Sequence, residues 1–392
     1  MKENKLEELI KKLCPNGVEY KKLEDCCNIL DNERKPVTKS ARIKGEYPYY
    51  GANGIQDYVS DYIFDGTFVL VGEDGSVINK NGSPVVTWAE GKIWVNNHAH
   101  VIKEKENVLL RYLYHYIQTI NVSVLIHGNI PKLNQGDFRN LRIAVPPLEV
   151  QCEIVHILDD FTLLSAELSA ELKARQKQFS YYRECLVNNG GHKIRLDKIV
   201  DIYLGLTHTP KYVTSGIKFI SAQNTSKDYL DLTNVKYISR EEYESITQNA
   251  KPKKGDILFT RVGSNLGHPV IVDTDEELCM FVSLGYLRVK DTSKVSIDYI
   301  KHWINTENFW NQVRKNVHGS AKVNLNTGWL SKFEISIPNF DEQKKIVNIL
   351  NVLEKLCNDI SEGLPAEIEA RQKQYEYYRD KLLTFKELKV NE

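Results

Sequence analysis

His98 and His100 are imidazole side chains separated by one residue, so they share one face of a predicted β-strand. Two such groups can bind a metal ion, but protein metal sites use three or more ligands, and no third ligand stands at a matching spacing. The 7 cysteines are scattered and include no CxxC pair, which argues against both a zinc site and a disulfide framework. The sequence therefore predicts no metal centre.

Catalytic motifs for nucleotide chemistry are missing. A methyltransferase needs a glycine-rich cofactor loop and an (N/D)PP(Y/F) segment, but the Pro-Pro pair of this chain is followed by Leu148. The phosphate-binding pattern GxxxxGK(S/T) does not occur. The E-x-K fragment of metal nucleases occurs at 19–21 and 342–344, but so loose a pattern arises by chance. We therefore expect a chain without catalytic residues and without a cofactor of its own.

The elements that position any site include one long segment that occurs twice. From Pro146 the first copy reads PPLEVQCEIVHILDDFTLLSAELSAELKARQKQFSYYRECLV, and from Pro338 the second reads PNFDEQKKIVNILNVLEKLCNDISEGLPAEIEARQKQYEYYRDKLL. Apolar residues recur in steps of three or four, which predicts a long helix with a coiled-coil seam in each copy. We expect the two helices to pair antiparallel. The alternative is a helical hairpin inside an ordinary core.

The two copies differ at one point. The second carries four extra residues, the size of a coiled-coil stutter, which leaves the flanking pattern in phase. Pro365 removes an amide from the helix interior, so a kink or short break is expected near Gly363 to Pro365.

The segments before the two helices are short apolar or alternating runs separated by Gly, Asn, Asp and Pro, which is typical of strands and turns. The fold class is therefore predicted as α+β, a tandem duplication of a β-rich globular domain followed by a long helix. The predicted boundaries are a first globular domain at 1–145, a first helix at 146–187, a second globular domain at 188–337, a second helix at 338–386 and a tail at 387–392.

Length and composition agree with this plan. The 392 residues are too many for one compact core, and 42% hydrophobic with 27% charged residues is ordinary globular usage. The 52 basic and 52 acidic side chains cancel, so no strong overall field draws the chain to nucleic acid or membrane, although one basic face can still bind DNA. The charged start of the chain lacks the apolar core of a signal peptide, which makes the cytoplasm the expected location.

These features resemble the specificity (S) subunits of type I restriction-modification systems over nearly the whole chain. The likeness rests on the two xQxxIVxIL...ARQKQxxYYR helices, on the loop that ends in Leu-Asn before each of them, and on the GEYPYY and GDILFTRVGS segments. In this family each globular half is a target recognition domain for one part of a split DNA sequence. The paired helices set the spacing and dock the modification subunits, and the S chain itself does not catalyse.

Candidate DNA contacts follow from the chemistry of base reading. Arg or Lys pairs with guanine and Asn or Gln with adenine, while other polar groups grip phosphate. Each candidate lies where a strand meets a turn, and each could instead bond its own backbone there. The candidates are Lys44, Tyr49, Tyr50, Asn53, Asn96, Asn97, His98, Asn129 and Lys132 in the first half, and Gln223, Asn224, Arg261, Ser264, Asn265, His318, Ser320 and Lys322 in the second.

Polar and aromatic residues recur on the two helices beyond what a seam requires. A surface for two identical partner subunits would explain the recurrence, because symmetric partners need matching patches. The candidates for this interface are Arg175, Gln178, Tyr181 and Arg183 in the first copy, and Arg371, Gln374, Tyr377 and Arg379 in the second.

The resemblance implies a DNA specificity subunit that recognises a bipartite target and directs adenine methylation, and cleavage where a restriction subunit is present. The implied partners are double-stranded DNA, two methyltransferase (M) subunits and, where one is encoded, restriction (R) subunits, with no membrane partner. S-adenosylmethionine is expected in the M subunits. Two alternatives stand beside this reading: a coiled-coil scaffold with β-rich protein- or glycan-binding domains, and an enzyme with an unrecognised site.

Overall fold

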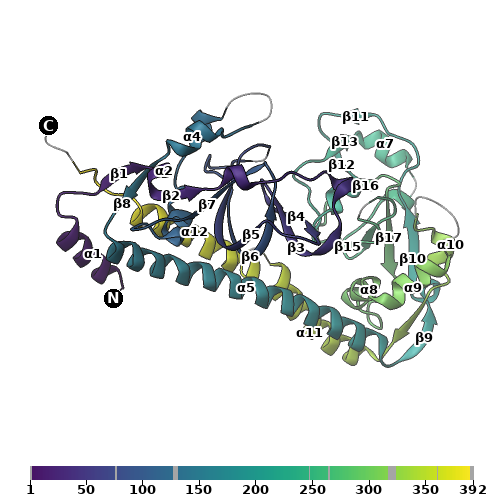
Figure 1. Cartoon of the computed structure of the whole chain (residues 1–392). Coiled ribbons are helices and arrows are strands. Elements are labelled where there is room, and N and C mark those ends of the chain that lie inside the picture. Colours follow the sequence, from purple (N-terminus) through teal and green to yellow (C-terminus); the bar gives the residue numbers. More distant parts are fainter. Residues whose placement is uncertain are drawn as a thin grey trace. The chain divides into compact units, whose positions relative to one another are not determined.

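The computed structural model describes residues 2–75, 77–126, 131–246, 248–263, 265–316, 324–359 and 361–388 (Figure 1). The chain divides into two compact units. Unit 1 comprises Met1–Ser169 and Glu367–Glu392, and unit 2 comprises Ala170–Ala366. The predicted α+β class with two tandem β-rich domains and a long helix is confirmed. The unit boundaries fall inside the repeated helical segments, so each unit contains helical residues from both copies.

Unit 1 is built on a six-stranded sheet with the order β2-β7-β5-β6-β3-β4. Its pairs are antiparallel except β3 with β6, which is parallel. The strands are β2 (Cys27–Ile29), β3 (Lys44–Gly51), β4 (Gly54–Val59), β5 (Phe64–Gly72), β6 (Val86–Val95) and β7 (Ala99–Glu104). The last five residues of β5 are all buried, as a central strand covered on both faces requires.

Smaller elements close the core of unit 1. The strands β1 (Glu19–Lys22) and β8 (Arg142–Val145) form a two-stranded sheet. The helices of the globular part are α1 (Lys2–Leu13), α2 (Leu23–Cys26), α3 (Leu110–Ile117) and α4 (Gln135–Arg139). Leu113 of α3, Phe138 of α4 and Ile143 of β8 are fully buried in one cluster with Val69 and Val71 of β5.

Unit 2 contains two four-stranded sheets and a two-stranded one. The first has the order β10-β17-β14-β15, the second β11-β13-β12-β16, and β18 pairs with β9. The strands are β9 (His192–Arg195), β10 (Val200–Leu204), β11 (Tyr212–Val213), β12 (Ile217–Ile220), β13 (Lys236–Ile238), β14 (Ile257–Thr260), β15 (Pro269–Ile271), β16 (Leu278–Met280), β17 (Leu284–Val289) and β18 (Glu334–Ile337). The helices of the globular part are α6 (Leu196–Ile199), α7 (Arg240–Ser245), α8 (Ile297–Ile304), α9 (Glu307–Asn316) and α10 (Thr327–Leu330).

The two units share one scaffold and differ in what is added to it. The order β2-β7-β5-β6 in unit 1 matches β10-β17-β14-β15 in unit 2, and the pair β1 and β8 matches β9 and β18. Unit 1 extends the shared sheet with β3 and β4, whereas unit 2 adds the separate sheet that contains β12. The duplication seen in the helices therefore extends through the globular parts.

The first helical copy forms a single helix, α5 (Leu148–Asn188). The second copy forms α11 (Phe340–Asn358) and α12 (Leu364–Leu382), and residues 359 and 361–363 between them are not helical. Pro365 lies in the first turn of α12, where a missing amide proton costs no hydrogen bond. A Cβ on Gly363 would lie 2.6 Å from the Asp359 carbonyl oxygen, so the close backbone approach needs glycine. Among the described residues, no helix has the length and apolar character needed to cross a membrane.

Within each unit, segments of both copies share a core. In unit 1 the Phe161 ring of α5 stacks on Tyr378 of α12, with ring centroids 5.2 Å apart. In unit 2 Phe179 of α5 belongs to the same buried cluster as Ile346 and Leu350 of α11. Apolar residues of both repeated segments are therefore buried together within each unit.

The repeated glutamine of xQxxIV ties each helix to its own domain. Gln151 is fully buried, and its Nε2 donates to the carbonyls of Asn107 (3.0 Å) and Pro146 (2.8 Å) while its Oε1 accepts from the Leu109 amide (2.9 Å). Gln343 makes the matching set in unit 2, donating to the carbonyls of Lys294 and Pro338 at 2.9 Å and accepting from the Ser296 amide at 2.8 Å. A buried amide with three satisfied bonds fixes where the helix starts.

Candidate nucleic-acid interface

Three loops meet at one end of the shared sheet in unit 1. They are 73–75 after β5, 96–98 between β6 and β7, and 131–134 before α4, and we call them the loop platform. The Glu73 amide donates to the His98 carbonyl at 2.8 Å, the Leu133 amide to the Glu73 carbonyl at 2.8 Å, and the Gly75 amide to the Pro131 carbonyl at 3.0 Å. Backbone bonds therefore hold residues far apart in sequence at one surface.

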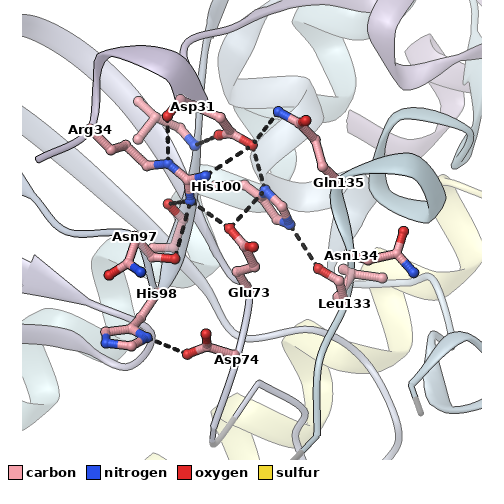
Figure 2. Close-up of polar contacts among 12 residues, drawn as sticks. Asp31, Arg34, Glu73, Asp74, Asn97, His98, His100, Leu133, Asn134 and Gln135 are labelled. Atoms are coloured by element: carbon pink, nitrogen blue, oxygen red, sulfur yellow. Dashed lines mark hydrogen bonds and ion pairs between the residues drawn. The ribbon is translucent and has the colours of Figure 1, made fainter. Parts of the chain in front are cut away.

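A buried cluster of charged side chains supports the loop platform (Figure 2). The Arg34 guanidinium donates to Glu73 Oε2 at 2.6 Å and to the Ala99 carbonyl at 2.8 Å. Lys132 Nζ lies 3.1 Å from the other oxygen of Glu73. Burial opposes ionisation of Glu73, but the bond from Arg34 and the charge of His100 outweigh it and lower its pKa.

His100 lies at the centre of the same cluster and is fully buried. Its Nδ1 faces Asp31 Oδ2 at 2.7 Å and its Nε2 faces the Leu133 carbonyl at 2.9 Å. Both ring nitrogens therefore face hydrogen-bond acceptors. Burial opposes ionisation of Asp31, yet the His100 bond and charge outweigh it and lower the pKa of Asp31.

Three side chains of this cluster are close enough together to bind a metal ion. The positive charge that an ion would supply to the carboxylates comes instead from cationic side chains of the protein. One ligand atom each of Asp31, Glu73 and His100 lie within 4.8 Å of one another. Arg34 pairs with both carboxylates, at 2.6 Å to Glu73 and 3.5 Å to Asp31, and both nitrogens of His100 are engaged. The cluster therefore acts as a structural ion network beneath the platform.

The predicted contacts of the first half separate into surface and core residues. Asn97, His98 and Lys132 are exposed and lie together on the loop platform, whereas Lys44 and Asn53 are exposed on β3 and on the turn after it. The side chains of Tyr49, Tyr50 and Asn96 are buried, at 1%, 8% and 3% exposure. A buried side chain has no free face for a base, so these three serve packing and turn formation. Asn129 lies outside the described residues.

The buried candidates Tyr49 and Asn96 form hydrogen bonds with the backbone of their own unit. The Tyr49 hydroxyl accepts from the Val37 amide at 3.0 Å. Asn96 Oδ1 accepts from the His98 amide at 2.8 Å, an Asx turn that shapes the loop between β6 and β7. This is the alternative that the sequence left open for each turn residue.

The second half shows a similar division. Arg261 is 8% exposed and donates to the carbonyls of Leu325 (3.1 Å) and Val282 (3.0 Å), which anchors the loop before α10. Asn224 is buried and accepts from the Ser221 amide at 2.9 Å in a capping box. Asn265 is half-buried and donates to the Thr225 carbonyl at 3.3 Å. Ser264, His318, Ser320 and Lys322 lie outside the described residues.

Gln223 is the exposed member of the described candidates in unit 2. It lines a surface hollow of about 590 Å³ that also contains Tyr212, Asn234 and Lys236. Lys236 Nζ lies 4.3 Å from the centre of the Tyr212 ring. Aromatic and cationic groups side by side suit stacking on bases and contact with phosphate. Sequence reasoning missed Tyr212 and Lys236 because strand patterning did not mark β11 and β13 as neighbours.

Sequence reasoning also missed Asp31, Arg34 and Glu73 of the buried cluster, and it considered His100 only as a possible metal ligand. Arg34 and Glu73 are 39 positions apart in the sequence, so no local pattern links them. The Glu-Asp pair after β5 was the available signal, because acidic groups directly after the buried apolar end of a strand require partners.

The helix candidates divide in the same way in both copies. Tyr181 and Tyr377 are exposed at 65% and 63%. Arg175 bonds Gln178 and Arg371 bonds Gln374, both at 3.0 Å, and these four side chains are partly exposed.

The two arginines of YYR lie closer to the core of their own units. Arg379 is 5% exposed, with its guanidinium 5.7 Å from the Tyr375 ring centre, and burial lowers the pKa of Arg183, which lies 5.0 Å from the Phe179 ring centre. The tyrosines thus present more surface than the arginines to a partner.

Comparison with known proteins identifies the family. The type I restriction modification DNA specificity domain matches twice, at residues 15–175 and 206–370. A putative type I restriction enzyme specificity subunit of Haemophilus influenzae is 38% identical over 383 residues, covering 94% of this chain and 96% of that protein. A type I restriction enzyme specificity subunit of Escherichia coli is 29% identical over 296 residues, covering 72% of each chain.

Solved structures show the same fold at low sequence identity. The S subunit of the type I restriction-modification system of M. genitalium aligns with a TM-score of 0.54 at 12% identity, over 94% of this chain and 96% of that one. A chain from a study of complex assembly and conformational transition of the type I system aligns with a TM-score of 0.62 at 14% identity, over 94% and 98%. With its specificity domain present twice, the chain belongs to the family of type I restriction-modification specificity subunits.

Proposed function

We propose that this chain is the DNA specificity subunit of a type I restriction-modification complex and that each unit reads one half of a bipartite target. The observation that carries the proposal is the shared scaffold built twice with different additions. One scaffold gives both units the same way of presenting loops, while different additions give each a different surface. A split recognition sequence with two unrelated halves requires that combination.

In this proposal the chain binds and orients DNA and leaves the chemistry to its partners. Side chains on the exposed loops contact base edges and phosphates, and the buried network of unit 1 keeps its loops in register for that contact. Two M subunits supply S-adenosylmethionine and methylate an adenine that is flipped out of the helix in each half-site. An R subunit adds cleavage where one is present.

The helical copies act as spacer and docking surface. We infer that α5 pairs with α11 and α12 as an antiparallel coiled coil, supported by the shared cores within each unit. The repeated exposed tyrosines, together with Arg175, Gln178 and their counterparts, offer two matching patches to two identical M subunits. The balanced charge of the chain fits a subunit that obtains part of its grip on DNA from its partners.

The test is to co-express the chain with the methyltransferase encoded beside it and to map methylated adenines across the host genome by single-molecule sequencing. The expected result is a split motif with a fixed gap. Exchange of residues 18–145 for those of a relative should change one half of the motif and leave the other half and the gap unchanged.

Two results would contradict the proposal. No association with the methyltransferase would favour the scaffold alternative, in which the β-rich domains bind protein or glycan. Methylation by the purified chain without any partner would place catalysis in the chain itself.

A further inference from the structure

His98 stands on the loop platform with its ring at the surface and one nitrogen already committed. Nδ1 faces the carboxylate of Asp74, whose side chain is 24% exposed, while the His98 side chain is 47% exposed (Figure 2). Within the described part of the chain, no bond to Nε2 of this ring is found. His98 therefore presents one defined ring atom to a ligand.

The chemistry of Asp74 fixes what that atom can do. An ionised carboxylate only accepts hydrogen bonds, so the proton of the neutral ring must sit on Nδ1. In this neutral form Nε2 carries a lone pair and accepts a hydrogen bond from outside. A histidine without this carboxylate would exchange between two tautomers and could not distinguish a donor from an acceptor.

The backbone around His98 is held from both sides. Its amide donates to Asn96 Oδ1 at 2.8 Å, and its carbonyl accepts from the Glu73 amide at 2.8 Å. Arg34 donates to the Ala99 carbonyl at 2.8 Å directly after it. Asp74 itself pairs with Lys132 through a β-bridge. The buried ion network thus holds both His98 and Asp74 in place. Less conformational entropy is therefore lost on binding than with a mobile side chain.

DNA offers a limited set of partners to such an acceptor. In the major groove the base-edge donors are the exocyclic amino groups of adenine (N6) and cytosine (N4), whereas guanine presents acceptors and thymine an acceptor and a methyl group. Phosphate oxygens are acceptors and would repel the Nε2 lone pair. The geometry therefore suits a base-edge contact better than a backbone contact.

Resting on the proposed function, we propose that His98 is a specificity-determining residue of unit 1, whose Nε2 accepts a hydrogen bond from the exocyclic amino group of an adenine or cytosine. Asp74 is its positioning residue. The contact would fix one base in the half-site that unit 1 reads.

Unit 2 has no such pair at the matching place, and this supplies an internal control. Gly72 pairs with Ala99 in unit 1 as Thr260 pairs with Leu284 in unit 2, so Ser283 corresponds to His98 and Val262 to Asp74. The Ser283 hydroxyl already accepts from the Ala222 amide at 3.2 Å. Changes at His98 should therefore alter one half of the target only.

The experiment compares the wild-type complex with His98→Ala and His98→Lys, and uses His192→Ala, an exposed histidine on β9, as the matched control. Genome-wide methylation mapping should show discrimination at one base of one half-site falling by about tenfold to a hundredfold in His98→Ala. His98→Lys, which can only donate, should move the preference at that base toward guanine. Thermal melting of each variant checks that it is folded.

Binding affinity for synthetic duplexes tests the contribution of the exocyclic amino group of the base directly. Replacing the identified adenine with purine, or the cytosine with a base that lacks the N4 amino group, should weaken the wild type by about tenfold and leave His98→Ala unaffected. An unchanged motif in His98→Ala, or a uniform loss at all sites without altered base preference, would overturn the proposal. A wild-type complex that methylates no split motif would instead refute the proposed function.

Discussion

Gln151 offers the sharpest test of how the repeated segment holds each domain. Gln151→Leu keeps the volume of the side chain but removes three hydrogen bonds, of 2.8, 2.9 and 3.0 Å. Each buried group left without a partner costs about 1 to 3 kcal/mol. Asn107 is an exposed residue, so its carbonyl recovers part of this cost by bonding to water. The free energy of unfolding of unit 1 should fall by about 3 to 4 kcal/mol. Its melting midpoint should drop by roughly 6 to 15 °C.

The assay must report the two units separately, because a chain with two cores does not unfold in one step. Hydrogen exchange with mass spectrometry across a urea series does so, with peptides from β5 for unit 1 and from β14 for unit 2. Gln151→Leu should shift the β5 peptides alone, and Gln343→Leu the β14 peptides alone.

The control is Gln372→Leu, which removes an exposed glutamine that bonds Glu376 at 2.9 Å. It should change stability by less than about 0.5 kcal/mol. If Gln151→Leu changes the urea midpoint of unit 1 no more than Gln372→Leu does, the buried amide does not anchor the helix and the reasoning fails. An equal shift of both units would also refute the assignment of each glutamine to its own domain.

Three further predictions follow from the buried groups. Arg34→Met leaves Glu73 buried beside its remaining partners and should destabilise unit 1 by about 3 kcal/mol, measured by the same exchange assay, with Arg34→Lys losing less. Burial lowers the pKa of His115 despite its bond to Asp159, so the unfolded chain binds a proton that the folded chain does not. The free energy of unfolding of unit 1 should therefore fall as pH drops below about 6.5 and stay level above it. Urea midpoints of unit 1 measured between pH 5 and 8 would show this. Burial raises the pKa of Cys27 to about 12, so an alkylating reagent at pH 8 should label the exposed Cys152 first and leave Cys27 unmodified, as peptide mass mapping would show; labelling of both at equal rates would contradict the described core.

The long repeats were readable from the sequence because their physics is local. Apolar steps of three and four residues specify a helix, and the verbatim ARQKQ and YYR motifs reveal the duplication without any structure. The placement of individual side chains was much less readable. Tyr49, Asn96 and Arg261 share the residue types of base-reading side chains, yet their exposures of 1%, 3% and 8% assign them to the core.

By itself the sequence determined two β-rich domains, two long helical segments and the family resemblance, because periodicity and repetition are properties of the chain alone. Only the tertiary structure decided that the strand order of one unit repeats in the other, and that Arg34, Glu73 and His100 form one network beneath His98. Those relations join residues tens of positions apart, and their energies depend on burial and on paired charges that no local pattern records. The exposed side chains of the loop platform, His98 first among them, are the ones that we propose for contact with DNA.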